Sequence, residues 1–184
     1  MKILVIRFSS IGDIVLTTPV VRCLRKQYPN AEIHYATKPA FQSILSANPY
    51  INKIHVLSGT ISQLVTQLKQ GNFDFVIDLH HNQRTLLLRT MLGVKSSAFN
   101  KINMEKWLMV NFKIDKLPHV HIVDRYLAAC AQLGVTNDGE GLDYFISKND
   151  EVQVHTLGEA FSKGYIGWVI GAKQYTKKFP IEKI

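Results

Sequence analysis

The stretch "KILVIRFSSIGDIVLTTP", residues 2–19, carries the clearest indication of the fold of this chain. Residues 2–8 form an apolar run typical of a buried parallel strand, and a short polar loop follows it at once. A helix-like stripe then begins, and Pro19 should kink or restart that helix. The stripe consists of the apolar residues Ile14, Val15, Val20, Val21 and Leu24. A strand, a polar loop and a helix in this order make the first half of a βαβ unit.

The same alternation continues along the chain. We expect further strands at residues 31–37, 53–57 and 73–80, and helices at residues 39–50, 61–71 and 82–93. This order predicts an α/β fold: a Rossmann-like parallel sheet with helices on both faces, joined by right-handed crossovers. Beyond it we expect a long helix at 122–134 and strand-like segments at 144–147 and 165–172.

Composition narrows the function classes. The chain has 184 residues, 46% of them hydrophobic, enough for one buried domain or one domain and the start of another. Its formal net charge of +8 favours anionic partners. Nucleic acid is disfavoured, because Arg-rich runs and zinc-finger spacing are absent from the sequence. Cys23 and Cys130 lie in apolar, helix-like segments and are expected to be buried free thiols. The short opening run is far from a membrane span, so we expect a cytoplasmic protein.

The loop after the first strand is the first candidate site. In open α/β sheets ligands bind beyond the carboxyl ends of the strands. Ser9 and Ser10 supply hydroxyls, Gly12 permits close backbone approach, and Asp13 supplies a carboxylate. Two interpretations of Asp13 are open. It forms a helix-capping pair with Ser10, or it is a catalytic carboxylate.

The segment "DLHHNQRT", residues 78–85, follows the fourth expected strand and should share the edge that carries Asp13. His80, His81, Asn82 and Arg84 suit recognition of an acidic sugar or a phosphate. The structural alternative is that Asn82 caps the next helix and the histidines fill the strand end. A zinc site from these histidines with His119 and His121 lacks any recognised spacing, so we expect no metal site.

A loosely patterned segment at residues 94–121 is a candidate binding insertion. It carries five lysines against Glu105 and Asp115. Its part at residues 95–116 either faces an anionic glycolipid or the membrane surface, or forms a solvated amphipathic helix. The residues that suggest a surface contact are Lys95, Lys101, Lys106 and Lys113, with Trp107 and Leu108 between them.

Several segments together resemble glycosyltransferase family 9, the ADP-heptose:lipopolysaccharide heptosyltransferases. They are residues 3–37, "DLHHNQRT", "HIVDRYLAACAQLG" and "GAKQYTKKFP". The most specific patterns are S-x-G-D-x-x-x-x-x-P at residues 10–19 and K-x-aromatic-P at residues 177–180. The resemblance implies a GT-B fold, of which residues 1–165 would be a Rossmann-like acceptor-binding domain. Residues 166–184 would be the start of a truncated C-terminal nucleotide-sugar-binding domain.

The resemblance also implies an activity. The protein would transfer a sugar, heptose from ADP-heptose, to an anionic lipid-linked acceptor such as the lipopolysaccharide core, with inversion and without a metal or other cofactor. Asp13 would be the base, and Lys177 would bind the donor diphosphate. Ser9, Ser10, Gly12, His80, Asn82 and Arg84 would contact the acceptor. The resemblance fits an enzyme at the inner face of the cytoplasmic membrane, and we expect the 184-residue chain alone to be inactive.

The chain departs from the family pattern at three positions. It has Phe179 where the family usually carries Trp, and Lys173 and Gln174 where small hydroxyl residues are common. Two alternatives therefore remain beside heptose transfer. One is a non-catalytic α/β module that binds a glycan or phosphate, since a fold does not determine a function. The other is a GT-B enzyme that uses a different nucleotide sugar, either another glycosyltransferase or an epimerase.

Overall fold

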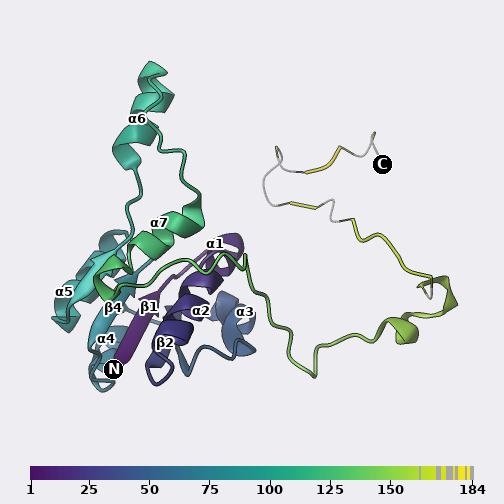
Figure 1. Ribbon diagram of the computed structural model, residues 1–184, viewed down its shortest axis with the longest axis horizontal. Coiled ribbons are helices and arrows are strands. Elements are labelled where there is room, and N and C mark those ends of the chain that lie inside the picture. Colours follow the sequence, from purple (N-terminus) through teal and green to yellow (C-terminus); the bar gives the residue numbers. More distant parts are fainter. Residues whose placement is uncertain (162, 169–170, 173–175, 177, 181, 183–184) are drawn as a thin grey trace. The chain divides into compact units, whose positions relative to one another are not determined.

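The computed structural model describes residues 1–161, 163–168, 171–172, 176, 178–180 and 182 (Figure 1). The chain divides into two compact units, Met1–Ser147 and Lys148–Ile184. Within its described residues, the second unit contains two short 3₁₀ turns, Val154–Leu157 and Glu159–Phe161. The expected assignment of residues 1–165 and 166–184 to acceptor and donor domains stays a prediction.

A five-stranded, all-parallel sheet forms the centre of the first unit. The strand order is β3-β2-β1-β4-β5, so the chain crosses from one side of β1 to the other between β3 and β4. Val5 of β1 lies opposite Tyr35 of β2 and Ile77 of β4. The sheet confirms the predicted Rossmann-like fold. The strands are β1 Lys2–Ile6, β2 Glu32–Thr37, β3 Lys53–Val56, β4 Phe75–Asp78 and β5 Ser96–Ala98.

Helices follow the strands in the predicted alternation. Pro19 restarts the first helical segment, because it lies at the start of α2 after α1 has ended. A 3₁₀ turn, Pro39–Phe41, precedes α3. The helices are α1 Ile11–Val15, α2 Thr18–Gln27, α3 Gln42–Ser46, α4 Ile61–Lys69, α5 Gln83–Leu92, α6 Asn103–Phe112 and α7 Ile122–Ala128. Among the described residues, none of these helices combines the length and apolar character needed to cross a membrane.

Side chains of β1 alternate between two hydrophobic cores. Ile3 and Val5 pack with residues of α2 and α7, whereas Leu4 and Ile6 pack with residues of α4 and α5. All four are fully buried, and complete burial of such a side chain contributes about 1.5–3 kcal/mol. The helices therefore cover both faces of the sheet, as predicted.

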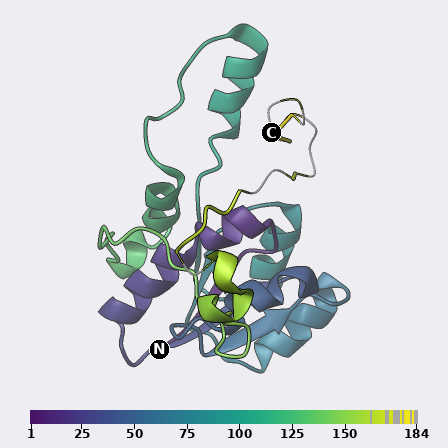
Figure 2. The ribbon, with the colours of Figure 1, turned by 90° about the vertical axis from the view of Figure 1, so that its right-hand side faces the viewer.

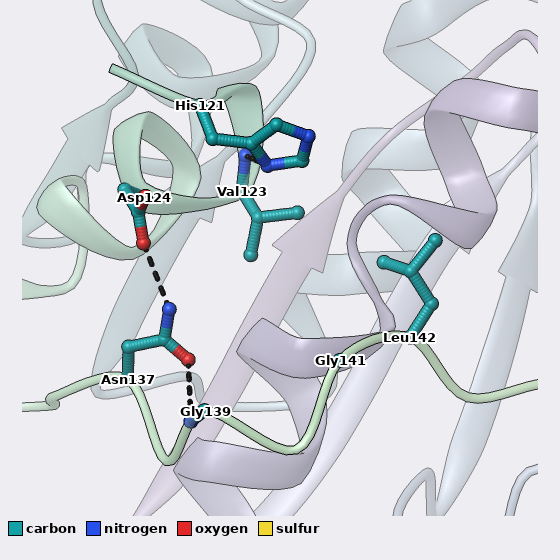
Figure 3. Close-up of a pocket in the computed structure, with 7 residues that line it drawn as sticks. All are labelled: His121, Val123, Asp124, Asn137, Gly139, Gly141 and Leu142. Carbon is teal, nitrogen blue, oxygen red and sulfur yellow. Dashed lines mark hydrogen bonds between the residues drawn. The ribbon is translucent and has the colours of Figure 1, made fainter.

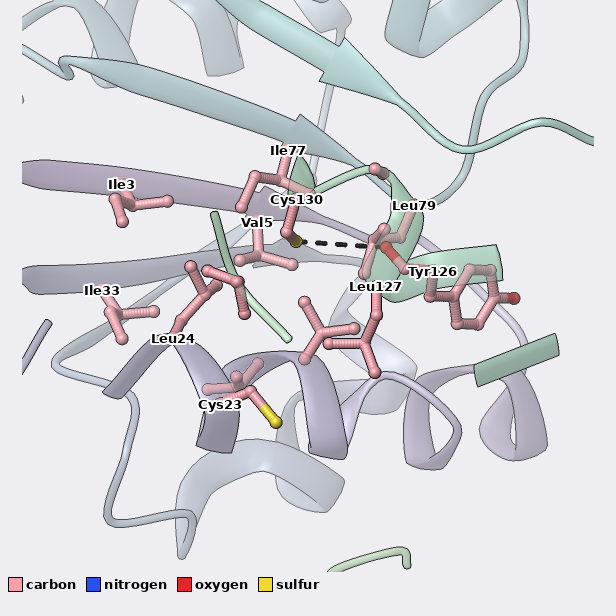
Figure 4. Packing of buried hydrophobic residues seen from close by; sticks show 14 of the residues in the cluster. Ile3, Val5, Cys23, Leu24, Ile33, Ile77, Leu79, Tyr126, Leu127 and Cys130 are labelled. Atoms are coloured by element: carbon pink, nitrogen blue, oxygen red, sulfur yellow. Dashed lines mark hydrogen bonds between the residues drawn. The ribbon is translucent and has the colours of Figure 1, made fainter. Parts of the chain in front are cut away.

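Both cysteines belong to the core that α2 and α7 share (Figure 4). Cys23 lies on α2, and Cys130 follows α7. Both are buried free thiols, which confirms the prediction. Burial raises the pKa of the Cys130 thiol to about 12.

Three expected elements are wrong. The long helix at 122–134 ends early, because α7 stops at Ala128 and only a 3₁₀ turn, Ala131–Leu133, follows. No strand forms at 144–147, where Ile146 is 61% exposed. Residues 165–168 also form no strand, and Ile166 is 96% exposed; residues 169–170 lie outside the described residues. Short apolar runs become strands only where a neighbouring strand pairs with them, and none of the described strands pairs with either segment.

A buried arginine fastens the loop after α7 to α2. Arg22 has a side chain only 2% exposed. Its Nε and Nη2 donate to both carboxylate oxygens of Asp138, at 2.8 and 2.7 Å, and its Nη1 donates to Asp143 at 2.5 Å. Lys26, one turn further along α2, contacts Asp138 at 3.0 Å. The hydrogen bonds from Arg22 hold the pKa of Asp138 far below its usual range.

Replacing Arg22 by Met should destabilise the first unit by about 3 kcal/mol, because the change leaves Asp138 and Asp143 without their buried cation. Urea unfolding followed by circular dichroism measures this loss. Lys26→Met is the matched control, since its side chain is 45% exposed and should cost much less. Equal losses in the two variants would contradict the role given to Arg22.

Candidate functional site

The loops that follow β1, β4 and β5 meet at the carboxyl edge of the sheet. Arg7, after β1, donates from Nη1 to the backbone oxygen of Leu79, after β4, at 2.5 Å. The backbone nitrogen of Phe99, after β5, donates to the oxygen of Asp78 at 3.1 Å. In parallel α/β sheets this edge is where ligands bind, so the predicted residues lie where a site is expected.

Arg7 is the buried cation of this edge. Its side chain is 9% exposed, and its Nη2 lies 2.6 Å from Oδ2 of Asp13. Its Nε donates to the backbone oxygen of Ser9 at 2.7 Å. The guanidinium also lies over the ring of Tyr126, 5.7 Å from the ring centre. Arg7 therefore holds the loop of residues 7–10 against β4 and α7.

Asp13 receives all its described polar contacts on one carboxylate oxygen. Oδ2 accepts from the backbone nitrogen and the hydroxyl of Ser10, at 3.1 and 2.8 Å, besides the contact with Arg7. None of the contacts between described residues involves Oδ1, and the side chain is 37% exposed. Partial burial acts to raise the pKa of Asp13, but the hydrogen bonds from Ser10 and Arg7 outweigh it and hold that pKa below its usual value.

The two interpretations of Asp13 are thus compatible in this geometry. The capping box with Ser10 is present at the start of α1, and it uses only Oδ2. The carboxylate is fixed on one side and accessible on the other. Such an arrangement suits a group that accepts a proton from a bound molecule.

The other predicted residues of this loop surround Asp13. Ser10 and Gly12 are exposed, and Ser9 is partly exposed. A Cβ atom built on Gly12 would meet nothing within 4 Å, so the space beside the backbone is open. These three residues stay predicted acceptor contacts.

A buried carboxylate, Asp78, organises the second predicted segment. Its Oδ1 accepts from the backbone nitrogens of His80 and His81, at 3.0 and 2.7 Å, and its Oδ2 lies 3.2 Å from Nε of Arg89. Asn82 caps α5, because its Oδ1 accepts from the backbone nitrogen of Thr85 at 3.0 Å. The structural alternative for Asn82 is therefore present, and its oxygen is already engaged.

The remaining residues of this segment differ in exposure. His80 is partly buried beside Phe8, with ring centres 5.5 Å apart. Burial, reinforced by the charges of Arg7 and Lys101, lowers the pKa of His80 to about 4, so its ring is neutral at pH 7. His81 lies close to the backbone oxygen of Phe99, with Nδ1 at 2.7 Å. Arg84 is exposed in the first turn of α5 and is available to an anion.

Three cations at this edge were missing from the predicted site residues: Arg7, Lys38 and Lys101. Burial, with a smaller effect of Arg7, lowers the pKa of Lys101, and the charges of Asp78 and Asp13 oppose this shift. Lys38 also acts on His80. Arg7 stands inside the motif that contains Asp13, and Lys38 directly follows the predicted second strand. The positions of Arg7 and Lys38 in the sequence could therefore have pointed to this edge. Lys101, in contrast, follows β5, a strand that the sequence does not predict.

The predicted donor-side residues belong to the second unit, and most of them are outside the described residues. Lys177, expected at the donor diphosphate, is outside the described residues, as are Lys173 and Gln174. Phe179 is described, and its ring centre lies 4.6 Å from that of Trp168. Within the described parts of the chain, no group of three or more His, Cys, Asp or Glu side chains is placed to hold a metal ion.

A pocket of about 270 Å³ lies between the start of α7 and the loop at 137–142 (Figure 3). Asn137 spans it, donating to Asp124 at 2.8 Å and accepting from the backbone nitrogen of Gly139 at 3.0 Å. His121 lines the same pocket. None of the predicted catalytic, acceptor or donor residues lines it, so it is distinct from the carboxyl-edge site.

Replacing Arg7 by Met should raise the pKa of Asp13, because the change removes the cation that contacts Oδ2. Titration of the Asp13 carboxyl carbon by ¹³C NMR measures this directly. Arg84→Met is the matched control, since Arg84 is exposed and should leave that pKa unchanged. An unchanged Asp13 titration in Arg7→Met would show that Arg7 does not govern this carboxylate.

Comparison with known proteins finds relatives that are named as heptosyltransferases. The sequence model of glycosyltransferase family 9 (heptosyltransferase) matches residues 61–183. Lipopolysaccharide heptosyltransferase 3 of Escherichia coli K12 is 30% identical over 139 residues, which cover 68% of this chain and 40% of that protein. Lipopolysaccharide heptosyltransferase 1 of Campylobacter coli is 27% identical over 123 residues, covering 64% and 36%.

Solved structures agree on the fold. The glycosyl transferase family 9 protein of Veillonella parvula has a TM-score of 0.71 at 26% identity, over 99% of this chain and 57% of its own. The E. coli heptosyltransferase WaaC, solved with ADP, has a TM-score of 0.60 at 20% identity, over 78% and 50%. These similarities confirm a Rossmann-like half of a GT-B fold.

The chain spans 36–44% of the length of the curated relatives that it matches. The family model nevertheless covers most of the chain, from residue 61 to residue 183. The β-strands, the carboxyl-edge loops and the sequence matches all agree with one assignment. The chain belongs to glycosyltransferase family 9, the heptosyltransferase family.

Proposed function

We propose that this protein is an inverting glycosyltransferase that moves heptose from ADP-heptose to an anionic, lipid-linked glycan of the lipopolysaccharide-core type. Family membership supports the class of reaction. The observation that carries the proposal is the geometry of Asp13: Oδ2 is held by Arg7 and Ser10, and Oδ1 is free of contacts with the described residues.

In the proposed reaction Asp13 acts as the general base. A sugar hydroxyl is a weak nucleophile, and a fixed carboxylate within hydrogen-bond reach strengthens it by taking its proton. As Oδ1 accepts the proton, the acceptor oxygen forms a bond to the anomeric carbon from the side opposite the diphosphate. The bond between that carbon and the diphosphate oxygen breaks, and ADP leaves with the electron pair.

The leaving diphosphate gathers negative charge and needs cations or helix N-termini beside it. We assign this role to Lys177, in line with the resemblance of the K-x-aromatic-P pattern, and we assign no metal or other cofactor to the reaction. Phe179 would replace the Trp that the family usually carries in this pattern.

The acceptor would bind across the carboxyl edge. Lys101, Lys38 and Arg84 supply positive charge there for phosphate or carboxylate groups on the glycan. The predicted contacts Ser9, Ser10, Gly12, His80 and Asn82 would bind its hydroxyls. Because a lipid-linked acceptor resides in a bilayer, the enzyme would act at the inner face of the cytoplasmic membrane.

Asp13→Asn should lower the transfer rate by about 10²–10⁴-fold, the usual contribution of a positioned general base. The Asn side chain keeps an oxygen for Ser10 and Arg7, so stability and acceptor binding should survive. Release of nucleotide diphosphate by the full-length gene product measures the rate. The matched control is Asp74→Asn, which removes an exposed carboxylate that accepts from the backbone nitrogen of Lys2 at 2.6 Å. Full turnover in Asp13→Asn would reduce Asp13 to a helix cap.

A nucleotide-sugar screen with a lipid A-core acceptor should show ADP release from ADP-heptose by the full-length gene product, and EDTA should not reduce it. The 184-residue chain alone should show none. Release only from another donor would remove heptose from the proposal but keep glycosyl transfer. Acceptor binding without release from any donor would favour the non-catalytic binding module.

A further inference from the structure

The helix α6 projects from the first unit, as two perpendicular views show (Figures 1 and 2). It follows β5 by four residues, so it starts from the carboxyl edge of the sheet. None of its ten residues is buried. None of the side chains of α6 therefore lies in either hydrophobic core.

This helix exposes large apolar side chains. Met104, Trp107 and Val110 are 71%, 55% and 68% exposed, and their spacing of three residues places them along one stripe. Phe112, on another side of the helix, is 59% exposed, and its ring centre lies 5.2 Å from that of Trp107. A solvated amphipathic helix would turn such residues toward the protein. Contiguous exposed apolar surface marks a place where another body binds.

Positive charge accompanies the apolar residues. Lys106, Lys113 and Lys116 are exposed on α6 and the segment that follows it, and Lys101 precedes the helix. The acidic residues of the same stretch are Glu105 and Asp115, so the four lysines outnumber the two carboxylates and leave a net positive charge. Trp and Lys side chains together fit the boundary between acyl chains and anionic headgroups, where the ring enters and the ammonium groups stay in water. This charge balance favours an anionic lipid surface over a purely apolar protein partner.

The length of α6 limits how it meets a bilayer. Ten residues of α-helix span about 15 Å, half of the hydrocarbon thickness, so α6 must lie in the interface and not cross it. We propose that α6 and its flanking lysines dock the protein onto an anionic bilayer, with Met104, Trp107 and Val110 inserted at the level of the headgroups.

Docking through α6 would orient the carboxyl edge of the sheet relative to the lipid surface. Lys101 lies between α6 and the site, where the charges of Arg7, Asp78 and Asp13 act on it. A membrane-bound α6 would therefore keep the edge that holds Asp13 close to the lipid surface, where the head of a lipid-linked acceptor emerges. This orientation rests on the proposed function, whereas the lipid contact itself does not.

Vesicle binding tests the inference. The sequence contains two tryptophans, so the variant Trp168→Phe leaves Trp107 as the only indole reporter. With vesicles of phosphatidylglycerol and phosphatidylcholine, the chain should co-sediment and the Trp107 emission should shift to shorter wavelength. Pure phosphatidylcholine vesicles should bind at least 10-fold less, and 0.5 M salt should weaken binding to the anionic vesicles, because salt screens the lysines.

Paired substitutions locate the contact. Trp107→Ser with Val110→Ser should weaken vesicle binding at least 10-fold without changing the urea midpoint, because neither residue is buried. Leu86→Ser with Leu87→Ser on α5 is the matched control, since these residues are 54% and 50% exposed, and it should bind normally. Lys106→Glu with Lys113→Glu should remove the preference for anionic vesicles, whereas Lys69→Glu on α4 should not.

The inference is overturned if wild-type protein does not bind anionic vesicles, or if the α6 variants bind them as well as wild type. It is also overturned if the same variants instead abolish a concentration-dependent dimer, which would make α6 an interface between two copies. If only the proposed function fails, no sugar should be transferred from any donor, while α6-dependent vesicle binding should persist. If both proposals hold, the α6 variants should still transfer sugar to a soluble, lipid-free acceptor.

Discussion

The arrangement of the carboxyl edge depends on one guanidinium. Arg7 is nearly buried, and a buried cation is tolerated only where its donors are satisfied. Its partners are the backbone oxygens of Ser9 and Leu79 and the carboxylate of Asp13, which come from two different loops. The hydrogen bonds that Arg7 donates therefore join the loop after β1 to the end of β4. Against the effect of partial burial, the hydrogen bonds from Ser10 and Arg7 hold the pKa of Asp13 below its usual value, and burial together with the charge of Arg7 lowers the pKa of His80.

This edge combines the partly exposed carboxylate of Asp13 with several cations. Asp13 presents Oδ1, while Lys101 and Arg84 lie on the segments around it. The proposed anionic acceptor would be attracted by these cations while its hydroxyl meets the carboxylate of Asp13, so the two charges need not conflict. The helix α6 leaves from the same edge with its apolar side chains exposed. The proposed proton transfer at Asp13 and the proposed membrane contact through α6 therefore involve the same end of the sheet.

Most of the sheet could be predicted because its strands are continuous apolar runs between polar loops, and Pro19 marked the break between α1 and α2. The sequence predicts Asp13 as a site residue because its motif follows such a strand. In contrast, Ser96–Ala98 has no apolar signal and forms β5 only through its pairing with β4. Lys101 follows that strand, so the sequence pattern does not point to it, whereas Arg7 stands inside the motif of Asp13 and could have been singled out. The segment at 144–147 has an apolar pattern, but none of the described strands pairs with it.

The proposed acceptor site is the carboxyl edge around Asp13. Backbone chemical-shift mapping of the ¹⁵N-labelled chain with a phosphorylated lipopolysaccharide-core oligosaccharide tests it most directly. If this edge binds the acceptor, shifts should concentrate at residues 9–13, at residues 80–84 and at Lys101. Shifts centred instead on the pocket that His121 and Asn137 line, or no saturable shifts at all, would contradict it.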